Sequence, residues 1–204
     1  TPGHEGMKGA LDLAKELANH INDSFQFNQF ENLANPEIHA KTTAKEIWEQ
    51  SNHNIDGLVT GVGTGGTVTG CASYLKEVNP ECKIYAVEPE RSAVISGKSP
   101  GPHQIQGIGA GFIPKVLQKD LIDEVFMIKD EEAFYFGRVL AKMEGLLSGI
   151  SSGAALAATI KIGQRKELQN KRIILILPSF GERYLSTAMF DSNTSIQARN
   201  DGYL

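Results

Sequence analysis

The 204-residue sequence carries its clearest chemical signal in residues 61–67, which read GVGTGGT. Glycines lack a Cβ atom, so the backbone there can curl and approach a ligand closely. If a helix begins at this segment, its first amide N–H groups lack acceptors within the helix, and the helix dipole favours an anion beside them. The hydroxyl groups of Thr64 and Thr67 add two donors. The segment therefore predicts a phosphate-binding loop, with a glycine-rich turn that binds nothing as the alternative.

The residues alone leave open which molecule carries the phosphate. Gly61, Gly63 and Gly66 fit the G-x-G-x-x-G pattern of dinucleotide-binding folds. Glu88 lies 22 residues after Gly66, where such folds place the acid that binds a ribose. Against a dinucleotide, about 55 residues precede the motif, whereas the corresponding strand usually opens its domain. A dinucleotide therefore stays an alternative, and it requires that Glu88 face the loop.

Ser179 is a second candidate, because it directly follows a near-continuous apolar run at residues 172–177. Such a run is typical of a strand in a parallel sheet that is covered on both faces. Ligands of such sheets bind at the carboxyl ends of the strands. Ser179 and the glycine loop are therefore expected in the same cavity, unless Ser179 only caps a following helix.

These candidates must be positioned by alternating strands and helices. Strands are predicted over residues 24–28, 57–61, 83–88, 122–129 and 172–177, and helices over 7–21, 36–50, 66–78, 130–143 and 153–167. This alternation predicts βαβ units, and so an α/β fold with a parallel-rich sheet flanked by helices. Residues 96–114 are too long and too rich in Pro and Gly for an ordinary connection, so a functional or mobile loop is expected there.

Finer details of the helices are also expected. Ile38, Ile47 and Trp48 are predicted to face inward from the helix over 36–50. Asp130 is a good N-cap for the helix that follows it, and the pair at 151–152, both Ser, is expected to cap the last helix.

Composition excludes several classes of protein. The formal net charge of −4 argues against a nucleic-acid partner, which normally meets a basic face. No apolar run is long enough to span a bilayer, and no secretory signal is recognisable at the start, so no membrane association is expected. Cys71 and Cys82 cannot supply a disulfide framework or a four-cysteine metal site, and no metal is predicted. A reducing, cytoplasmic setting is the default expectation.

Four segments together resemble the cysteine synthases, also called O-acetylserine sulfhydrylases. They are GTGGT at 63–67, PGPHQIQGIGAGFIP at 100–114, GISSGAA at 149–155 and PSFGERYLST at 178–187. The likeness extends over most of the chain, from residue 6 to residue 190. It implies an enzyme that depends on pyridoxal 5′-phosphate (PLP), with the fold type II, or tryptophan synthase β-like, architecture.

The resemblance assigns roles to individual residues. The residues that match the family's 5′-phosphate loop are Gly63, Thr64, Gly65, Gly66 and Thr67. Ser179 matches the serine that hydrogen-bonds the pyridine nitrogen, where a neutral hydroxyl makes a weaker electron sink than a carboxylate would. Gln29 and Gly107 match positions beside the substrate carboxylate and the mouth of the site.

The implied reaction is β-replacement of acetate in O-acetyl-L-serine by sulfide, which gives L-cysteine. The implied partners are O-acetylserine, sulfide, a second copy in a homodimer and serine acetyltransferase, which docks near the loop over 100–114. Two other functions compete with this one. The first is a truncated homologue that binds partners without catalysis. The second is a dehydrogenase of the Rossmann type that binds a nicotinamide dinucleotide.

The sequence departs from the family at its start. No lysine lies in a Pro-x-x-Ser-x-Lys-Asp context, so no catalytic Schiff-base lysine is assigned, and the Ser-x-Asn-Thr-Gly loop is also missing. The expectation is a chain that lacks the family's N-terminal portion and is inactive alone, with any organellar leader lost as well. Residues 1–32 would be a remnant of the smaller domain, 33–190 the PLP-binding domain and 191–204 a flexible tail.

Overall fold

The computed structural model describes residues 1–191, and it contains one four-stranded sheet. The strands are β1 (Gly57–Gly61), β2 (Lys83–Pro89), β3 (Glu124–Ile128) and β4 (Ile173–Leu175). Their order is β3-β2-β1-β4, and every pairing is parallel. The predicted parallel α/β architecture is confirmed. Apart from residue 191, the predicted tail lies outside the described residues.

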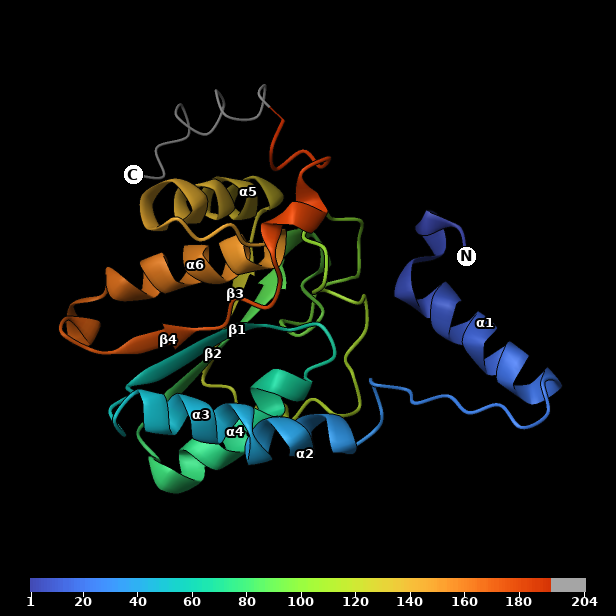
Figure 1. Ribbon diagram of the computed structural model, residues 1–204, viewed down its shortest axis with the longest axis horizontal. Coiled ribbons are helices and arrows are strands. Elements are labelled where there is room, and N and C mark those ends of the chain that lie inside the picture. Colours follow the sequence, from blue (N-terminus) through green and yellow to red (C-terminus); the bar gives the residue numbers. More distant parts are fainter. Residues whose placement is uncertain (192–204) are drawn as a thin grey trace.

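Helices cover both faces of this sheet (Figure 1). The α-helices are α1 (Gly6–His20), α2 (Ala34–Lys41), α3 (Thr43–Gln50), α4 (Gly66–Val78), α5 (Asp130–Val139) and α6 (Ile150–Gly163). Short turns of 3-10 or π helix are η1 (Gly3–Glu5), η2 (Glu90–Ser92), η3 (Lys119–Leu121), η4 (Leu140–Glu144), η5 (Lys166–Leu168) and η6 (Gly181–Tyr184). Helices α2, α3 and α4 lie on one side of the sheet, and α5 and α6 lie on the other.

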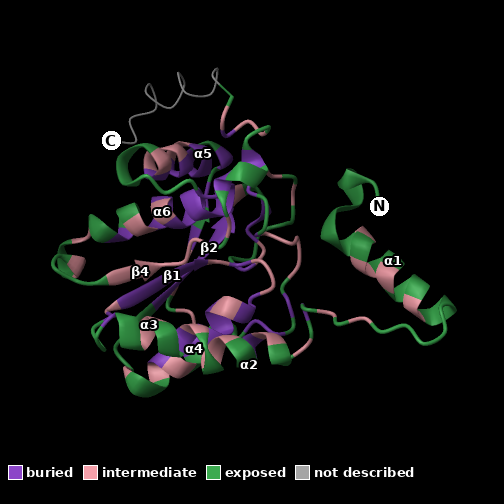
Figure 2. Ribbon diagram, viewed as in Figure 1, coloured by how far each residue is buried: buried purple, intermediate pink, exposed green. Residues whose placement is uncertain are grey.

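Two apolar cores lie between the sheet and its helices, one on each face of the sheet. Successive residues of a strand point to opposite faces, so neighbouring residues serve different cores. Leu58 packs in the core that includes Leu75 of α4, whereas Val59 packs in the core that includes Ala154 of α6. Figure 2 shows β1 and β2 largely buried between these layers, whereas β4 is only partly buried. This double cover fixes the strands and holds their carboxyl ends, including Gly61, at one edge.

The elements that flank the glycine loop were predicted correctly. The strand over 57–61 and the helix over 66–78 have the predicted bounds, and residues 96–114 contain no helix or strand. The sequence signal here is local, because an apolar run ends in glycines and an amphipathic period follows.

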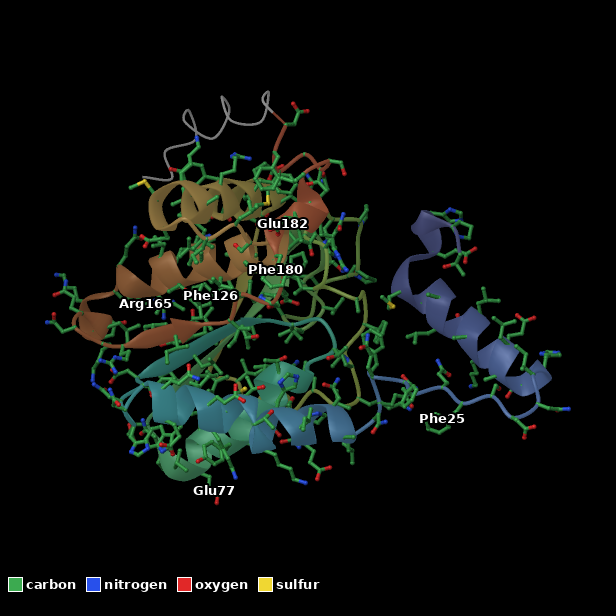
Figure 3. The ribbon with its side chains drawn as sticks, in the orientation of Figure 1. Phe25, Glu77, Phe126, Arg165, Phe180 and Glu182 are labelled. Carbon is green, nitrogen blue, oxygen red and sulfur yellow. The ribbon has the colours of Figure 1, made fainter. Side chains whose placement is uncertain are left out.

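Two predictions for the N-terminal third were wrong. Residues 24–28 form no strand, and Phe25 and Phe27 are each 78% exposed, because no described strand offers them a ladder partner. Figure 3 labels Phe25 on the segment that follows α1. The predicted helix over 36–50 is two helices, because Thr42 leaves the helical region with φ −122° and ψ −77°. As a result Ile38 is exposed, although Ile47 and Trp48 do pack against the core.

The C-terminal predictions also need corrections at the ends of elements. Asp130 does not cap α5. It is the buried first residue, and the N–H of Lys129 donates to Glu132 Oε2 at 3.1 Å instead. Helix α6 begins at residue 150 after Gly149, so the two serines lie in its first turn rather than before it. Strand β4 is shorter than predicted and half-buried, because it pairs with β1 alone.

Helix α1 lies to one side of the sheet in Figure 1 and buries none of its residues. The predicted domain division after residue 32 stays a prediction. Among residues 1–191, no helix has both the length and the apolar character needed to cross a membrane.

Candidate cofactor site

The glycine loop joins the buried end of β1 to the start of α4. Gly65 is left-handed, with φ +85° and ψ −4°, a conformation that favours glycine. Gly65 is the N-cap residue of α4, and it has no side chain that could accept from the first amides of the helix. Among the hydrogen bonds of the described residues, the amides of Gly63, Thr64, Gly65 and Thr67 have no acceptor. Four backbone donors at a helix N-terminus suit an anion such as a phosphate.

The glycine loop also has no room for side chains at two of its glycines. A Cβ atom on Gly63 would overlap the carbonyl oxygen of Gly107, and one on Gly66 would overlap the side chain of Asn35. These glycines therefore let two other segments approach the loop closely. The residues present fit the 5′-phosphate of PLP, because small size and free amides are what a buried phosphate requires.

Both threonines of the loop are held by helix α2. Asn35 Nδ2 donates to Thr64 Oγ1 at 3.0 Å, and His39 Nε2 lies 3.3 Å from Thr67 Oγ1. Sequence analysis missed both residues, since neither lies near the loop along the chain. The contact becomes possible because Gly70 of α4 lets the backbone of α2 pack against it.

Gly107 is where the long loop meets the glycine loop, with φ +94°. The N–H of Gly109 donates to Val62 O at 3.0 Å, which ties the two loops together. A Cβ on Gly107 would lie 3.8 Å from Ser151 Oγ in the first turn of α6. Gly107 therefore sits between the glycine loop and the start of α6.

Ser179 lies beside the start of α6 as well. Its carbonyl oxygen accepts from Gly149 N–H at 3.0 Å, and its hydroxyl lies 3.2 Å from the hydroxyl of Tyr184. The alternative that Ser179 caps a helix is not supported, because the residue before η6 is Phe180 and the hydroxyl contacts Tyr184 instead. Phe180 is 81% exposed and is labelled in Figure 3.

Glu88 does not serve the glycine loop. Glu88 is 1% exposed, and its carboxylate accepts hydrogen bonds from the N–H groups of Ile95 and Ser96, at 2.9 and 3.0 Å. Both oxygens are therefore used to hold the start of the long loop. The dinucleotide alternative loses the acid that it needs to bind a ribose.

Gln29 reaches the site through its backbone. Its carbonyl oxygen accepts from Asn35 Nδ2 at 2.7 Å, and the same nitrogen donates to Thr64. Gln29 is exposed, and it begins the short segment that enters α2. Gly107 thus packs directly against the glycine loop, whereas Gln29 is connected to the loop through Asn35.

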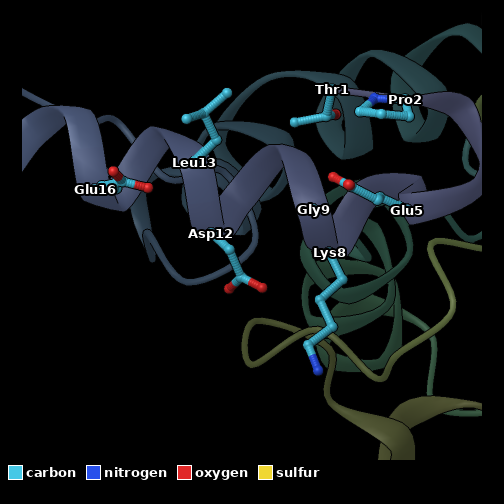
Figure 4. A pocket seen from close by; sticks show the side chains of 8 residues that line it. All are labelled: Thr1, Pro2, Glu5, Lys8, Gly9, Asp12, Leu13 and Glu16. Atoms are coloured by element: carbon cyan, nitrogen blue, oxygen red, sulfur yellow. The ribbon is translucent and has the colours of Figure 1, made fainter.

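A separate hollow of about 620 Å³ runs along α1, and Figure 4 shows it from close by. It is lined by Thr1, Pro2, Glu5, Lys8, Gly9, Asp12, Leu13 and Glu16. None of these is a predicted site residue, and the hollow lies on a helix that buries no side chain. It contributes nothing to the candidate site.

The two cysteines are free and buried. Burial raises the pKa of Cys71 to about 12 and the pKa of Cys82 to about 11. The thiolate is the reactive form of cysteine, so neither residue is a nucleophile at neutral pH. In the described residues, no group of three or more His, Cys, Asp or Glu could hold a metal ion.

His39 should make the stability of the fold depend on pH. Burial lowers the pKa of His39 below its usual 6.5, so as pH falls the unfolded chain takes up a proton before the folded chain does. The free energy of unfolding should therefore decrease below pH 6.5, until the pKa of the folded form is passed. Urea unfolding at pH 7.5 and 5.5 should show a larger loss for the wild type than for His39→Gln. Equal losses in the two proteins would contradict this account.

Known proteins resemble the chain closely. The model of the family described as "Pyridoxal-phosphate dependent enzyme" matches residues 2–179. Cysteine synthase from Buchnera aphidicola subsp. Acyrthosiphon pisum is 51% identical, and the match covers 93% of this chain and 63% of that protein. Cysteine synthase A from Escherichia coli K12 is 49% identical, with 93% and 62% covered.

Solved structures agree with these relatives. Cysteine synthase from Entamoeba histolytica matches with a TM-score of 0.89 and 44% identity, over 98% of this chain and 60% of that one. The O-acetylserine dependent cystathionine β-synthase from Helicobacter pylori matches with a TM-score of 0.88 and 43% identity, over 94% and 62%. The chain thus spans less than two thirds of the length of these relatives. On the family match and the fold, the chain belongs to the pyridoxal-phosphate dependent enzymes.

Proposed function

We propose that this chain forms the phosphate and pyridine side of a cysteine synthase active site. The reaction is replacement of acetate in O-acetyl-L-serine by sulfide, which gives L-cysteine. The observation that carries the proposal is the glycine loop, where four amides without acceptors stand at the start of α4. The cysteine synthases among the relatives support the same reaction.

In this proposal the chain's own residues bind and orient the cofactor. The amides of Gly63, Thr64, Gly65 and Thr67 bind the 5′-phosphate, together with the hydroxyls of the two threonines. When bound, PLP supplies an electron sink for the substrate's α-carbon. Ser179 offers a neutral hydroxyl to the pyridine nitrogen, which leaves that nitrogen less protonated than a carboxylate would. In the proposal, Gln29 and Gly107 contribute to the substrate side of the site. Their support is that Gly107 packs against the glycine loop and that Gln29 is joined to it through Asn35.

The function is tested best in a chimera, because the chain spans about 62% of the Escherichia coli relative. The chimera joins the unmatched part of that relative to this chain. We expect it to form cysteine from O-acetylserine and sulfide, and Thr64→Val in the chimera to reduce the rate. A chimera that folds and binds PLP but forms no cysteine would contradict the proposed reaction. It would favour the alternative of a chain that only binds partners.

The chain alone is expected to form no Schiff base at a unique lysine, because no lysine lies in the family's Pro-x-x-Ser-x-Lys-Asp context. Incubation with PLP, reduction with borohydride and peptide mapping measure this. Scattered, substoichiometric labelling of surface lysines is the expected result. One lysine labelled stoichiometrically would overturn the assignment.

The proposal extends to partners and location. It includes a homodimer, which is tested by measuring the mass of the protein by sedimentation. It also includes docking of serine acetyltransferase near residues 100–114, which is tested by comparing the wild type with Gly101→Glu in a pull-down. The proposal also includes a cytoplasmic location, and the support for it is that two buried, free cysteines suit a reducing compartment.

A further inference from the structure

The side chain of Asn35 joins two parts of the candidate site. Its Nδ2 atom donates to Gln29 O at 2.7 Å and to Thr64 Oγ1 at 3.0 Å. Gln29 lies 6 residues before Asn35, and Thr64 lies 29 residues after it. One amide group in the first turn of α2 therefore binds both the segment that contains Gln29 and the glycine loop.

The hydrogen bonds of Thr64 determine where its proton goes. A threonine hydroxyl has one proton to donate and two lone pairs that accept. Thr64 Oγ1 accepts from Asn35 Nδ2 at 3.0 Å and from Gly66 N–H at 3.2 Å. Both lone pairs are used, so the proton cannot point at either of these donors and must be directed to another acceptor.

We propose that Asn35 is a positioning residue that directs the Thr64 hydroxyl proton toward the cofactor phosphate. The proposal rests on the proposed function, which assigns the phosphate to the glycine loop. The amides of Gly63, Gly65 and Thr67 lie within three residues of Thr64 and have no acceptor. An anion bound by them is the acceptor that the Thr64 proton lacks.

The close fit of Asn35 explains the glycine at position 66. A Cβ atom on Gly66 would overlap Cγ and Oδ1 of Asn35, and it would lie 2.7 Å from Nδ2. Any larger residue at 66 would push the amide away from Thr64. The glycine therefore serves the asparagine contact, in addition to the open approach of a ligand.

Replacement of Asn35 by aspartate reverses the hydrogen bond while keeping the shape. A carboxylate oxygen in place of Nδ2 accepts, so Thr64 would give its proton to Asp and turn a lone pair toward the phosphate. The added negative charge repels the phosphate as well. We expect Asn35→Asp to weaken binding of PLP to the chain by about 30-fold, and Asn35→Ala by about 5-fold. Titration followed by PLP fluorescence measures both.

Asn32 provides a matched control from the same segment. Its side chain donates to Phe27 O at 3.1 Å and accepts from Ala34 N–H at 3.0 Å, and neither partner is in the glycine loop. Asn32→Ala removes two local hydrogen bonds at the start of α2. It should lower stability as Asn35→Ala does, but change PLP affinity by less than about 2-fold.

A double-mutant cycle with Thr64→Val separates positioning from a general structural role. Valine has no hydroxyl to direct, so Asn35→Asp should reduce PLP affinity far less in this background, where charge repulsion and the lost hydrogen bond to Gln29 O are the effects left. An equal cost in both backgrounds would overturn the proposal. If Thr64→Val weakens binding and Asn35→Asp does not, only the role of Asn35 fails. If the wild type binds PLP no better than pyridoxal, which lacks the phosphate, the proposed function fails together with this inference.

Discussion

Replacing Gly63 by alanine is expected to weaken PLP binding by about 30-fold, because overpacking of about 2 kcal/mol would fall on the binding loop. The new Cβ would overlap the backbone carbonyl of Gly107, which cannot rotate away as a flexible side chain could. The hydrogen bond from Gly109 N–H to Val62 O holds the two loops together, so relief requires that they separate. Calorimetric titration with PLP measures the loss.

Gly3→Ala is the control for this substitution, since nothing lies within 4 Å of a Cβ at that position. It should leave PLP affinity unchanged. If Gly63→Ala binds as tightly as the wild type while Gly3→Ala does the same, the close approach of the two loops has no role in binding.

The second large effect is expected on stability, at the crossing of α5 and α6. A Cβ atom on Gly153 would overlap Ala133 O and lie 2.6 Å from Gly137 N, both backbone atoms of α5. The helices would have to move apart, and the core that contains Ala154 and Met189 would open. We expect Gly153→Ala to lower the free energy of unfolding by about 3 kcal/mol, measured by urea denaturation.

Gly163→Ala lies in the same helix and meets nothing within 4 Å. Replacing glycine by alanine inside a helix stabilises by about 0.5–1 kcal/mol, and a smaller gain of the same sign is expected at position 163, the last residue of α6. Opposite signs for the two substitutions are therefore predicted. Similar small effects at both positions would mean that α5 and α6 do not pack as closely as described.

The parts of this structure that could be predicted are those with local causes. The strand over 57–61 ends where an apolar run meets glycine, and the helix over 66–78 repeats apolar residues at its own period. The segment over 24–28 has strand-like residues, but a strand also needs a neighbour, which its sequence does not encode. Helix α2 ends just before Thr42, whose hydroxyl donates to Ile38 O. No proline or glycine marks this position, so the sequence does not predict the end of the helix there.

The supports of the site could not be predicted for a different reason. Asn35 and His39 meet Thr64 and Thr67 only because α2 packs on α4, a contact between segments almost thirty residues apart. The family resemblance named the loop and Ser179, but it said nothing of these partners. The alternative role of Glu88 was settled only when its carboxylate was found on the N–H groups of residues 95 and 96.

The most direct test of the central claim follows the backbone amides of the glycine loop during a titration with PLP. In a ¹⁵N-labelled chain, the amide resonances of Gly63, Thr64, Gly65 and Thr67 should shift with PLP and with inorganic phosphate. Those of residues along α1 should not move, and NAD should produce no such shifts. Saturating PLP that leaves all four loop amides unchanged would contradict the account.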